Sequence, residues 1–259
     1  MPVAEIAGCR MRYEIRGPVD APVLVLSNSL GTDLGLWDLQ IGELITRHRV
    51  LRYDTRGHGR SSVTPGPYTL QRLARDVVDL LDALSIVRVD FCGLSLGGMI
   101  GLSLACDFPG RLRRLVVSDS AAQIGTQAGW NERIAAVNSG GMAAITASVL
   151  GRWFTDQFRA RAPGQVQRIA SQLAATPADG YAACCAAIRD ADLRGAVPAI
   201  RVPTLVVVGR DDPAIPPSAG QWLAATIPGA QYCELPTAHL SNVEDPVAFT
   251  SALTRFLAA

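Results

Sequence analysis

Apolar runs that predict strands alternate with amphipathic stretches that predict helices in both outer parts of the chain. Residues 22–27 are apolar on both faces, as expected for a central strand of a parallel sheet. Residues 1–16 alternate apolar and polar side chains, which predicts a two-stranded antiparallel edge. Further strands are predicted at residues 50–53, 87–91, 112–118, 203–209 and 231–235, and helices at residues 37–47, 70–84, 99–108, 218–226 and 246–257. This order predicts an α/β fold with a doubly wound, mostly parallel sheet.

The middle of the chain has a different texture. Residues 122–200 contain no convincing strand, are rich in alanine, and are interrupted by glycine and proline at several points. They predict three or more helices. We therefore expect a discontinuous core formed by residues 1–121 and 201–259, with a helical cap or lid inserted at residues 122–200.

Composition narrows the possible partners and locations. The chain has 259 residues, of which 49% are hydrophobic and 18% charged, and its formal net charge is +1, without a basic stripe. Neither a nucleic acid nor an anionic membrane surface is expected as a partner. The first residues carry no targeting pattern, and no run approaches the roughly 18 apolar residues of a membrane span. A cytoplasmic location is therefore expected.

The six cysteines, at positions 9, 92, 106, 184, 185 and 233, have no C-x-x-C spacing and no histidine beside them. Neither a zinc site nor a disulfide framework is predicted. Most of these cysteines are expected to be small, buried, hydrophobic side chains.

The segment with the strongest chemical signal is Gly93-Leu94-Ser95-Leu96-Gly97, between a predicted strand and a predicted helix. A turn this sharp crowds its central residue, so residues without bulk are needed two positions before and after it. The first N–H groups of the helix then face whatever the serine attacks. This context predicts a G-x-S-x-G nucleophile elbow with Ser95 as the nucleophile. The simpler alternative is a glycine-rich turn with a capping serine.

A serine nucleophile needs a histidine within hydrogen-bond reach, and the chain has three. His48 lies at a helix end beside arginines, where a solvated surface position is expected. His58 lies in a Gly-His-Gly loop, where it is expected to fix the loop structure. His239 follows the last predicted strand, at the carboxyl ends of the strands, where the loops that carry functional residues lie in α/β sheets. We therefore predict His239 as the general base.

The acid that orients the histidine is expected in the loop after the preceding strand. That loop contains Asp211 and Asp212, and we choose Asp212 because it lies further into the turn, with Asp211 expected to be solvated or paired with an arginine. Asp119, after the strand that ends at residue 118, is the other candidate. The chain order Ser95, Asp212, His239 is the order of α/β-hydrolases.

Two N–H donors are needed to stabilise the oxyanion, and removal of one typically costs about 3 kcal/mol of transition-state stabilisation. The backbone of Leu96 is predicted to supply the first. Leu30, three residues after the strand at residues 22–27, is predicted to supply the second. The alternative for this segment is an ordinary turn.

These residues resemble the α/β-hydrolase superfamily over the whole chain. The segments Ser27-Asn28-Ser29-Leu30-Gly31, Trp37-Asp38-Leu39-Gln40 and Gly209-Arg210-Asp211-Asp212-Pro213-Ala214, with the elbow Gly-Leu-Ser-Leu-Gly-Gly, are similar to those of the 3-oxoadipate enol-lactonases. The resemblance favours Asp212 over Asp211. It implies the α/β-hydrolase fold with a helical lid, no cofactor, an anionic lactone as a small-molecule substrate, and a place in bacterial breakdown of aromatic compounds.

Such a lactone carries a free carboxylate, which is costly to bury without a cationic partner. Arg133 lies one helical turn from Trp130, so that the cation and the ring would share a face. Trp153 stands in a Trp-Phe pair that is too apolar for a wet surface. We hypothesise that Arg133 binds the carboxylate and that Trp153 shapes the pocket. The alternatives are a solvated arginine and a tryptophan that only packs the lid on the core.

Two other functions remain open. One is another serine hydrolase of this fold, such as a carboxylesterase, a perhydrolase or a carbon–carbon bond hydrolase. The other is a small-ligand receptor that keeps the fold without useful turnover. Dehalogenases and epoxide hydrolases of this fold use an aspartate nucleophile, so Ser95 argues against them.

Overall fold

The computed structural model describes residues 2–259 and contains an eight-stranded sheet in the order β1-β2-β4-β3-β5-β6-β7-β8. The hairpin β1 (Val3–Ile6) and β2 (Cys9–Arg16) is antiparallel and forms one edge, as predicted. The other six strands run parallel: β3 (Val23–Ser27), β4 (Arg49–Tyr53), β5 (Val89–Leu94), β6 (Leu112–Ser118), β7 (Thr204–Gly209) and β8 (Gln231–Leu235). The predicted doubly wound sheet is confirmed.

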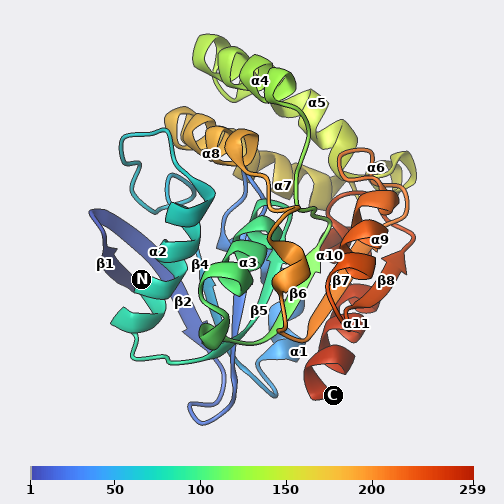
Figure 1. Cartoon of the computed structure of the whole chain (residues 1–259). Helices are drawn as coiled ribbons and strands as arrows, with labels where there is room; N and C mark the ends of the chain where they lie inside the picture. Colours follow the sequence, from blue (N-terminus) through green and yellow to red (C-terminus); the bar gives the residue numbers. More distant parts are fainter. Residues whose placement is uncertain (1) are drawn as a thin grey trace.

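Helices cover both faces of this sheet (Figure 1). On one face lie α2 (Leu70–Ala83), α3 (Leu96–Asp107) and α9 (Pro217–Thr226), and on the other α1 (Asp38–Leu44) and α11 (Pro246–Ala258). Thr69 caps α2 by accepting a hydrogen bond from the N–H of Arg72 at 3.1 Å. Short helical turns complete the core: η1 (Leu34–Trp37), η2 (Pro109–Arg111), η3 (Val197–Ala199) and α10 (Ser241–Glu244).

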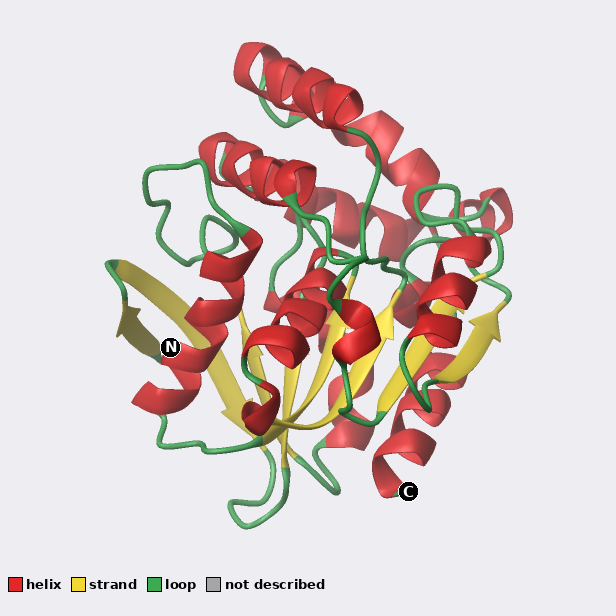
Figure 2. Cartoon of the chain, in the orientation of Figure 1, coloured by secondary structure: helices red, strands yellow, loops and turns green. Residues whose placement is uncertain are grey.

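Five helices and no strand follow one another between β6 and η3. They are α4 (Gln127–Gly140), α5 (Ala143–Trp153), α6 (Asp156–Arg161), α7 (Pro163–Ala175) and α8 (Ala178–Asp190). Figure 2 shows this helical layer on the side to which the arrowheads of the parallel strands point. The carboxyl ends of the strands, where ligands bind in open α/β sheets, therefore face the helices.

The predicted boundaries around the elbow shift towards Ser95. β5 runs to Leu94 instead of ending at residue 91, and α3 begins at Leu96 instead of residue 99. The strand extends because Gly93 still pairs with Ser27 of β3 on one side and Val117 of β6 on the other. At the other end Val87 is 79% exposed and lies outside the strand. Strand and helix therefore meet at one residue.

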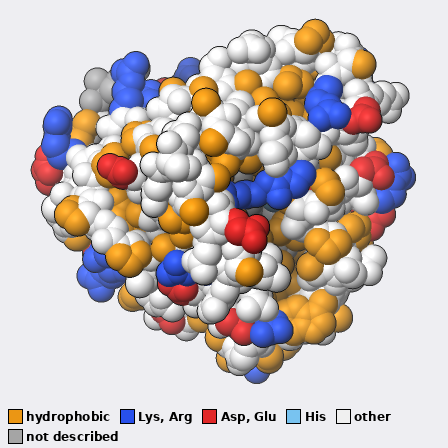
Figure 3. All heavy atoms as spheres, turned by 90° about the horizontal axis from the view of Figure 1, so that it is seen from above, with side chains coloured by type: hydrophobic (Ala, Val, Ile, Leu, Met, Phe, Trp, Pro, Cys, Tyr) orange, Lys and Arg blue, Asp and Glu red, His pale blue; other side chains and the backbone are white. Residues whose placement is uncertain are grey.

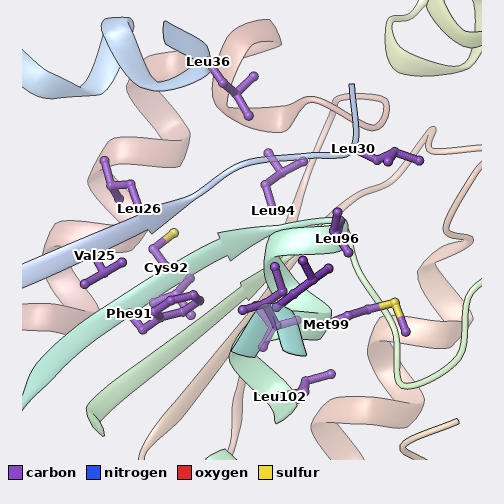
Figure 4. Close-up of a cluster of buried hydrophobic side chains, with 14 of the residues drawn as sticks. Val25, Leu26, Leu30, Leu36, Phe91, Cys92, Leu94, Leu96, Met99 and Leu102 are labelled. Carbon is purple, nitrogen blue, oxygen red and sulfur yellow. The ribbon is translucent and has the colours of Figure 1, made fainter. Parts of the chain in front are cut away.

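Apolar side chains of the central strands and α3 form the core around this junction, among them Phe91, Cys92, Met99 and Leu102 (Figure 4). All six cysteines are free thiols, and four of them are buried, which agrees with their predicted role as small hydrophobic side chains. Among residues 2–259 none of the helices has the length and apolar character needed to cross a bilayer.

Candidate active site

Ser95 occupies the sharp turn between β5 and α3 with a positive φ of 56°, a conformation that L residues rarely adopt. Its N–H donates a hydrogen bond to the carbonyl of Ser118 at 2.9 Å. A Cβ atom on Gly93 would lie 2.0 Å from the carbonyl oxygen of Gly97, and one on Gly97 would lie 2.2 Å from the carbonyl oxygen of Ser27. The turn therefore requires glycine at both positions, as the elbow hypothesis expected.

Asp212 and His239 meet at the carboxyl ends of β7 and β8. Nδ1 of His239 lies 2.7 Å from Oδ2 of Asp212, and both side chains are buried. The second oxygen, Oδ1, accepts hydrogen bonds from the N–H groups of Ala214 at 2.7 Å and Ile215 at 3.0 Å. The carboxylate is thus held in place on one side while it orients the imidazole on the other.

The two alternative acids lie elsewhere. Asp211 is exposed, with its carboxylate 3.5 Å from the guanidinium of Arg210. Asp119 is buried but accepts hydrogen bonds from Ser118, Gly209 and Ser241 and none from a histidine. The geometry therefore brings His239 together with Asp212.

The pKa of His239 reflects two opposing influences. Burial alone lowers it, but the negative charge of Asp212 and the hydrogen bond to it raise it, and the result is a pKa above the ordinary value of 6.5. The negative charge of Asp212 therefore stabilises the imidazolium that forms when His239 takes up a proton. This is the property that a general base needs.

The two residues predicted to supply the oxyanion donors, Leu30 and Leu96, come from the loop after β3 and from the first position of α3. Leu96 is the first residue of α3, so its N–H has no carbonyl partner within the helix. Leu30 follows β3 and lines the same pocket as Ser95. Figure 4 shows the loop that carries Leu30 passing beside the turn that carries Leu96.

Asn28 fastens this loop to its surroundings. Its carbonyl accepts a hydrogen bond from the N–H of Gly97 at 3.1 Å, so the loop is tied to the elbow. Its side chain donates to the carbonyl of Tyr53 at 2.7 Å and accepts from the indole N–H of Trp37 at 2.9 Å. The asparagine thus satisfies donors and acceptors on three neighbouring segments.

A cavity of about 300 Å³ lies beside Ser95, between the sheet and the helical layer. The core contributes Ser29, Leu30, Ser95, Pro213, Ala214, Ile215 and His239 to its lining. The segment at residues 124–129 and the helices α4, α5 and α8 contribute Ile124, Gly125, Thr126, Gly129, Trp130, Arg133, Arg152, Trp153, Tyr181 and Ile188. A substrate in this cavity contacts both parts of the chain.

Residues 22–246 match the protein family described as alpha/beta hydrolase fold. The chain belongs to this family. It is 41% identical to 3-oxoadipate enol-lactonase 1 of Acinetobacter baylyi over 96% of this chain and 94% of that one, and 40% identical to 3-oxoadipate enol-lactonase 2 of the same organism over 94% and 91%. The crystal structure of the enol-lactonase from Burkholderia xenovorans LB400 superposes with a TM-score of 0.98 at 44% identity, over the full length of both chains. The resemblance to the enol-lactonases is confirmed.

The two residues of the helical layer that the sequence singled out both line the pocket of this alpha/beta hydrolase. The guanidinium carbon of Arg133 lies 4.8 Å from the centre of the Trp130 ring, so the cation and the ring do share a face. The positive charge of Arg133 also interacts with the hydroxyl of Tyr181. Trp153 is 5% exposed.

Sequence reasoning missed Arg152, a second arginine in the pocket lining. Burial, followed by the positive charge of Arg133, lowers the pKa of Arg152. Neither arginine forms an ion pair with a carboxylate of residues 2–259, whereas most arginines of the chain do. The sequence signal was its spacing in α5, because Arg152 lies three residues after Val149 and seven after Ile145 and so shares a helical face with these buried side chains.

The other two histidines lie outside the pocket lining. His58 is fully buried, which lowers its pKa to about 4, and its Nδ1 lies 3.3 Å from the carbonyl of Arg56 in its own loop, consistent with the predicted role in loop structure. The prediction for His48 was wrong: its side chain is buried rather than solvated, and burial lowers its pKa. Asp90 of β5 and Arg113 of β6 are the charged groups that interact with it most strongly. Across residues 2–259, no three His, Cys, Asp or Glu side chains gather in a way that could hold a metal ion.

Proposed function

We propose that this protein is a serine hydrolase that opens the ring of 3-oxoadipate enol-lactone to give 3-oxoadipate, in the breakdown of aromatic compounds. The observation that carries the proposal is one cavity that combines an elbow serine, a histidine held by a buried aspartate, and two arginines without carboxylate partners. The relatives named enol-lactonase point to the same reaction.

The first step is acylation of Ser95. Its hydroxyl oxygen attacks the lactone carbonyl while Nε2 of His239 takes the proton, and the carbonyl oxygen becomes an oxyanion that accepts hydrogen bonds from the N–H groups of Leu30 and Leu96. Asp212 remains ionised and stabilises the imidazolium. Because these donors are fixed by the elbow and by Asn28, little reorganisation is needed when the charge develops.

The second step opens the ring and releases the acid. The tetrahedral intermediate expels the ring oxygen as an enolate, which takes the proton from His239 to give an enol and then a ketone. The ring oxygen stays attached to the acyl-enzyme because the lactone is cyclic. Water activated by His239 then attacks the acyl carbon, and the acyl bond to Ser95 breaks to give the free carboxylate.

The two arginines suit a substrate that carries a carboxylate away from the reacting carbonyl. A buried carboxylate needs a cationic partner, and a guanidinium can supply two parallel N–H donors. Arg133 is positioned by Trp130 and Tyr181, while Arg152 comes from the next helix. We assign both to the substrate carboxylate, and we assign Trp153 to the apolar wall of the pocket.

We further propose that residues 122–200 act as a lid on a core of residues 1–121 and 201–259. The cavity lining supports this assignment because it comes from both parts. Residues 122–200 enter and leave the core through one loop at each end, and their helices form a layer at the carboxyl ends of the parallel strands. A cytoplasmic location remains a prediction.

The substrate preference tests the proposal. The ratio of kcat/KM for 3-oxoadipate enol-lactone to kcat/KM for a neutral phenyl ester is expected to exceed roughly 100, the gain that about 3 kcal/mol from charge-assisted hydrogen bonds provides. If the phenyl ester is turned over and the lactone is not, a general esterase is the better description. If neither is turned over, the receptor hypothesis is favoured.

A further inference from the structure

A second buried carboxylate lies behind the Asp212–His239 pair. Asp119 follows directly after β6, is fully buried, and has a positive φ of 46°. Its N–H donates a hydrogen bond to the carbonyl of Val207 in β7 at 2.8 Å, so the residue is fixed between two strands. A strained, buried and charged residue persists only where its surroundings hold it in place.

The contacts of Asp119 reach both loops that supply the Asp212–His239 pair. Its Oδ1 accepts hydrogen bonds from the N–H of Gly209 at 2.8 Å and from the hydroxyl of Ser241 at 2.9 Å. Gly209 ends β7, three residues before Asp212, and Ser241 begins α10, two residues after His239. One carboxylate oxygen therefore bridges the two loops.

The bridge acts at a point of close contact. A Cβ atom on Gly209 would lie 2.2 Å from the carbonyl oxygen of Ala238, the residue before His239. A small shift of Gly209 therefore displaces the backbone next to the histidine. The hydroxyl of Ser241 is in turn 2.7 Å from that of Thr237, which fixes the beginning of the same turn.

We propose that Asp119 is a positioning residue: its carboxylate sets the distance and angle between Asp212 and His239 by holding Gly209 and Ser241 together. The inference rests on the proposed function for its kinetic consequences, because positioning matters only if His239 acts as the base. A misplacement of about 1 Å in a catalytic group costs on the order of 100-fold in rate. A second direct contact between the loops, from the N–H of Asp211 to the carbonyl of Thr237 at 2.9 Å, limits the expected loss.

The charge of Asp119 adds a second effect. Asp212, His239 and the thiol of Cys92 in β5 are the titratable groups that interact with it electrostatically. Burial, followed by the charge of Asp212, raises the pKa of Asp119 to about 7. When ionised, Asp119 raises the pKa of His239, in addition to the larger effect of Asp212.

Two substitutions separate the effect of the hydrogen-bond bridge from the effect of the charge of Asp119. Asp119→Ala removes both. Asp119→Asn keeps an oxygen that can accept from Gly209 and Ser241, and its amide group can donate to the hydroxyl of Ser118, which lies 2.7 Å from Oδ2 in the native protein. Asp90→Asn is the matched control, because Asp90 is also buried but pairs with Arg113 at the far end of β5.

We expect Asp119→Ala to lower kcat by roughly 10- to 100-fold with less than about threefold change in KM, since the substrate pocket itself is untouched. Asp119→Asn should recover at least about tenfold of that loss and should move the acid limb of the pH profile to lower pH, because His239 loses a neighbouring negative charge. Asp90→Asn should lower Tm and leave kcat and the pH profile unchanged.

Equal kcat in wild type and Asp119→Ala would overturn the proposal, and so would an Asp119→Asn variant as slow as Asp119→Ala. If Asp119→Ala does not fold, Ser241→Ala removes one arm of the bridge and should lower kcat in the same direction. The low-field proton NMR signal of the His239–Asp212 hydrogen bond provides a readout that needs no substrate. It should shift in Asp119→Ala and not in the Asp90→Asn control, so a failure of the proposed reaction in wild type is distinguishable from a failure of this inference.

Discussion

The N–H of Leu240 donates a hydrogen bond to the carbonyl of Trp153 at 3.1 Å. The first residue follows His239 directly, and the second lies in the wall of the pocket formed by the helical layer. Glu244 strengthens the link, because its carboxylate accepts from the N–H of Ala238 and from both the N–H and the hydroxyl of Thr155. The segment that holds the histidine is therefore hydrogen-bonded to the helical segment that lines the pocket.

Glu244→Gln tests this link. A glutamine can keep the oxygen that accepts from the N–H groups of Ala238 and Thr155, but its amide group replaces the oxygen that accepts from the hydroxyl of Thr155, and that hydroxyl loses its acceptor at a cost of about 1–3 kcal/mol. We expect a lower Tm and a lower kcat for lactone hydrolysis. Glu234→Gln, on the exposed side of β8, is the control and should change neither. An unchanged kcat in Glu244→Gln would mean that the helical layer does not influence His239 through this contact.

Substitution of Gly97 should be strongly damaging, because the added methyl group would clash with backbone. A Cβ atom there would meet the carbonyl oxygen of Ser27 at 2.2 Å, and backbone cannot move aside as a flexible side chain can. We expect Gly97→Ala to lose activity and several degrees of Tm. Gly110→Ala is the control, since nothing lies within 4 Å of the added methyl group. Full activity in Gly97→Ala would contradict the elbow geometry.

The two pocket arginines predict a charge-specific effect on substrate binding. Arg133→Ala and Arg152→Ala should each raise KM for the anionic lactone by roughly 10- to 100-fold, the worth of a charge-assisted hydrogen bond. KM for a neutral phenyl ester should change little. Arg194→Ala, which removes an exposed arginine paired with Asp192, is the control. Equal effects on both substrates would indicate a packing role instead of carboxylate recognition.

The pKa of His239 predicts the pH dependence of the reaction. The imidazole must be neutral to take the proton from Ser95, so kcat/KM falls as the pH falls through its pKa, which lies above 6.5. In Asp212→Asn the charge that raises this pKa is gone and burial lowers it, so the acid limb should move to lower pH, while kcat falls by roughly 10⁴-fold as in other triads. If the acid limb of the Asp212→Asn profile does not move, the titrating group is not His239.

The fold could be predicted because each strand, helix and sharp turn is encoded by the residues of its own short segment. Continuous apolar runs identify buried parallel strands, and the glycines around Ser95 mark a turn that no other residue fits. That Ser95, Asp212 and His239 lie close together could be inferred because the loops at the carboxyl ends of parallel strands converge at one edge of the sheet.

The remaining features depend on contacts between segments far apart in sequence. The spacing of Arg152 from Ile145 and Val149 places it on the buried face of α5, but the sequence alone does not show that this face meets a cavity. The side chain of His48 is buried, although both of its neighbours in the sequence are arginines. Asp119 and Glu244 both connect the histidine segment to residues far away in the sequence. The 2.8 Å contact between Asp119 and Gly209 spans 90 positions, and the contact between Thr155 and Glu244 spans 89.

Ser95 is the proposed nucleophile that opens the enol-lactone ring. The most direct measurement follows the ultraviolet absorbance of 3-oxoadipate enol-lactone mixed with purified wild-type protein and with Ser95→Ala. We expect rapid loss of the lactone with wild type, and with Ser95→Ala a rate reduced by roughly 10⁶-fold. Persistence of the lactone with wild type, or its rapid loss with Ser95→Ala, would show that Ser95 does not open the ring.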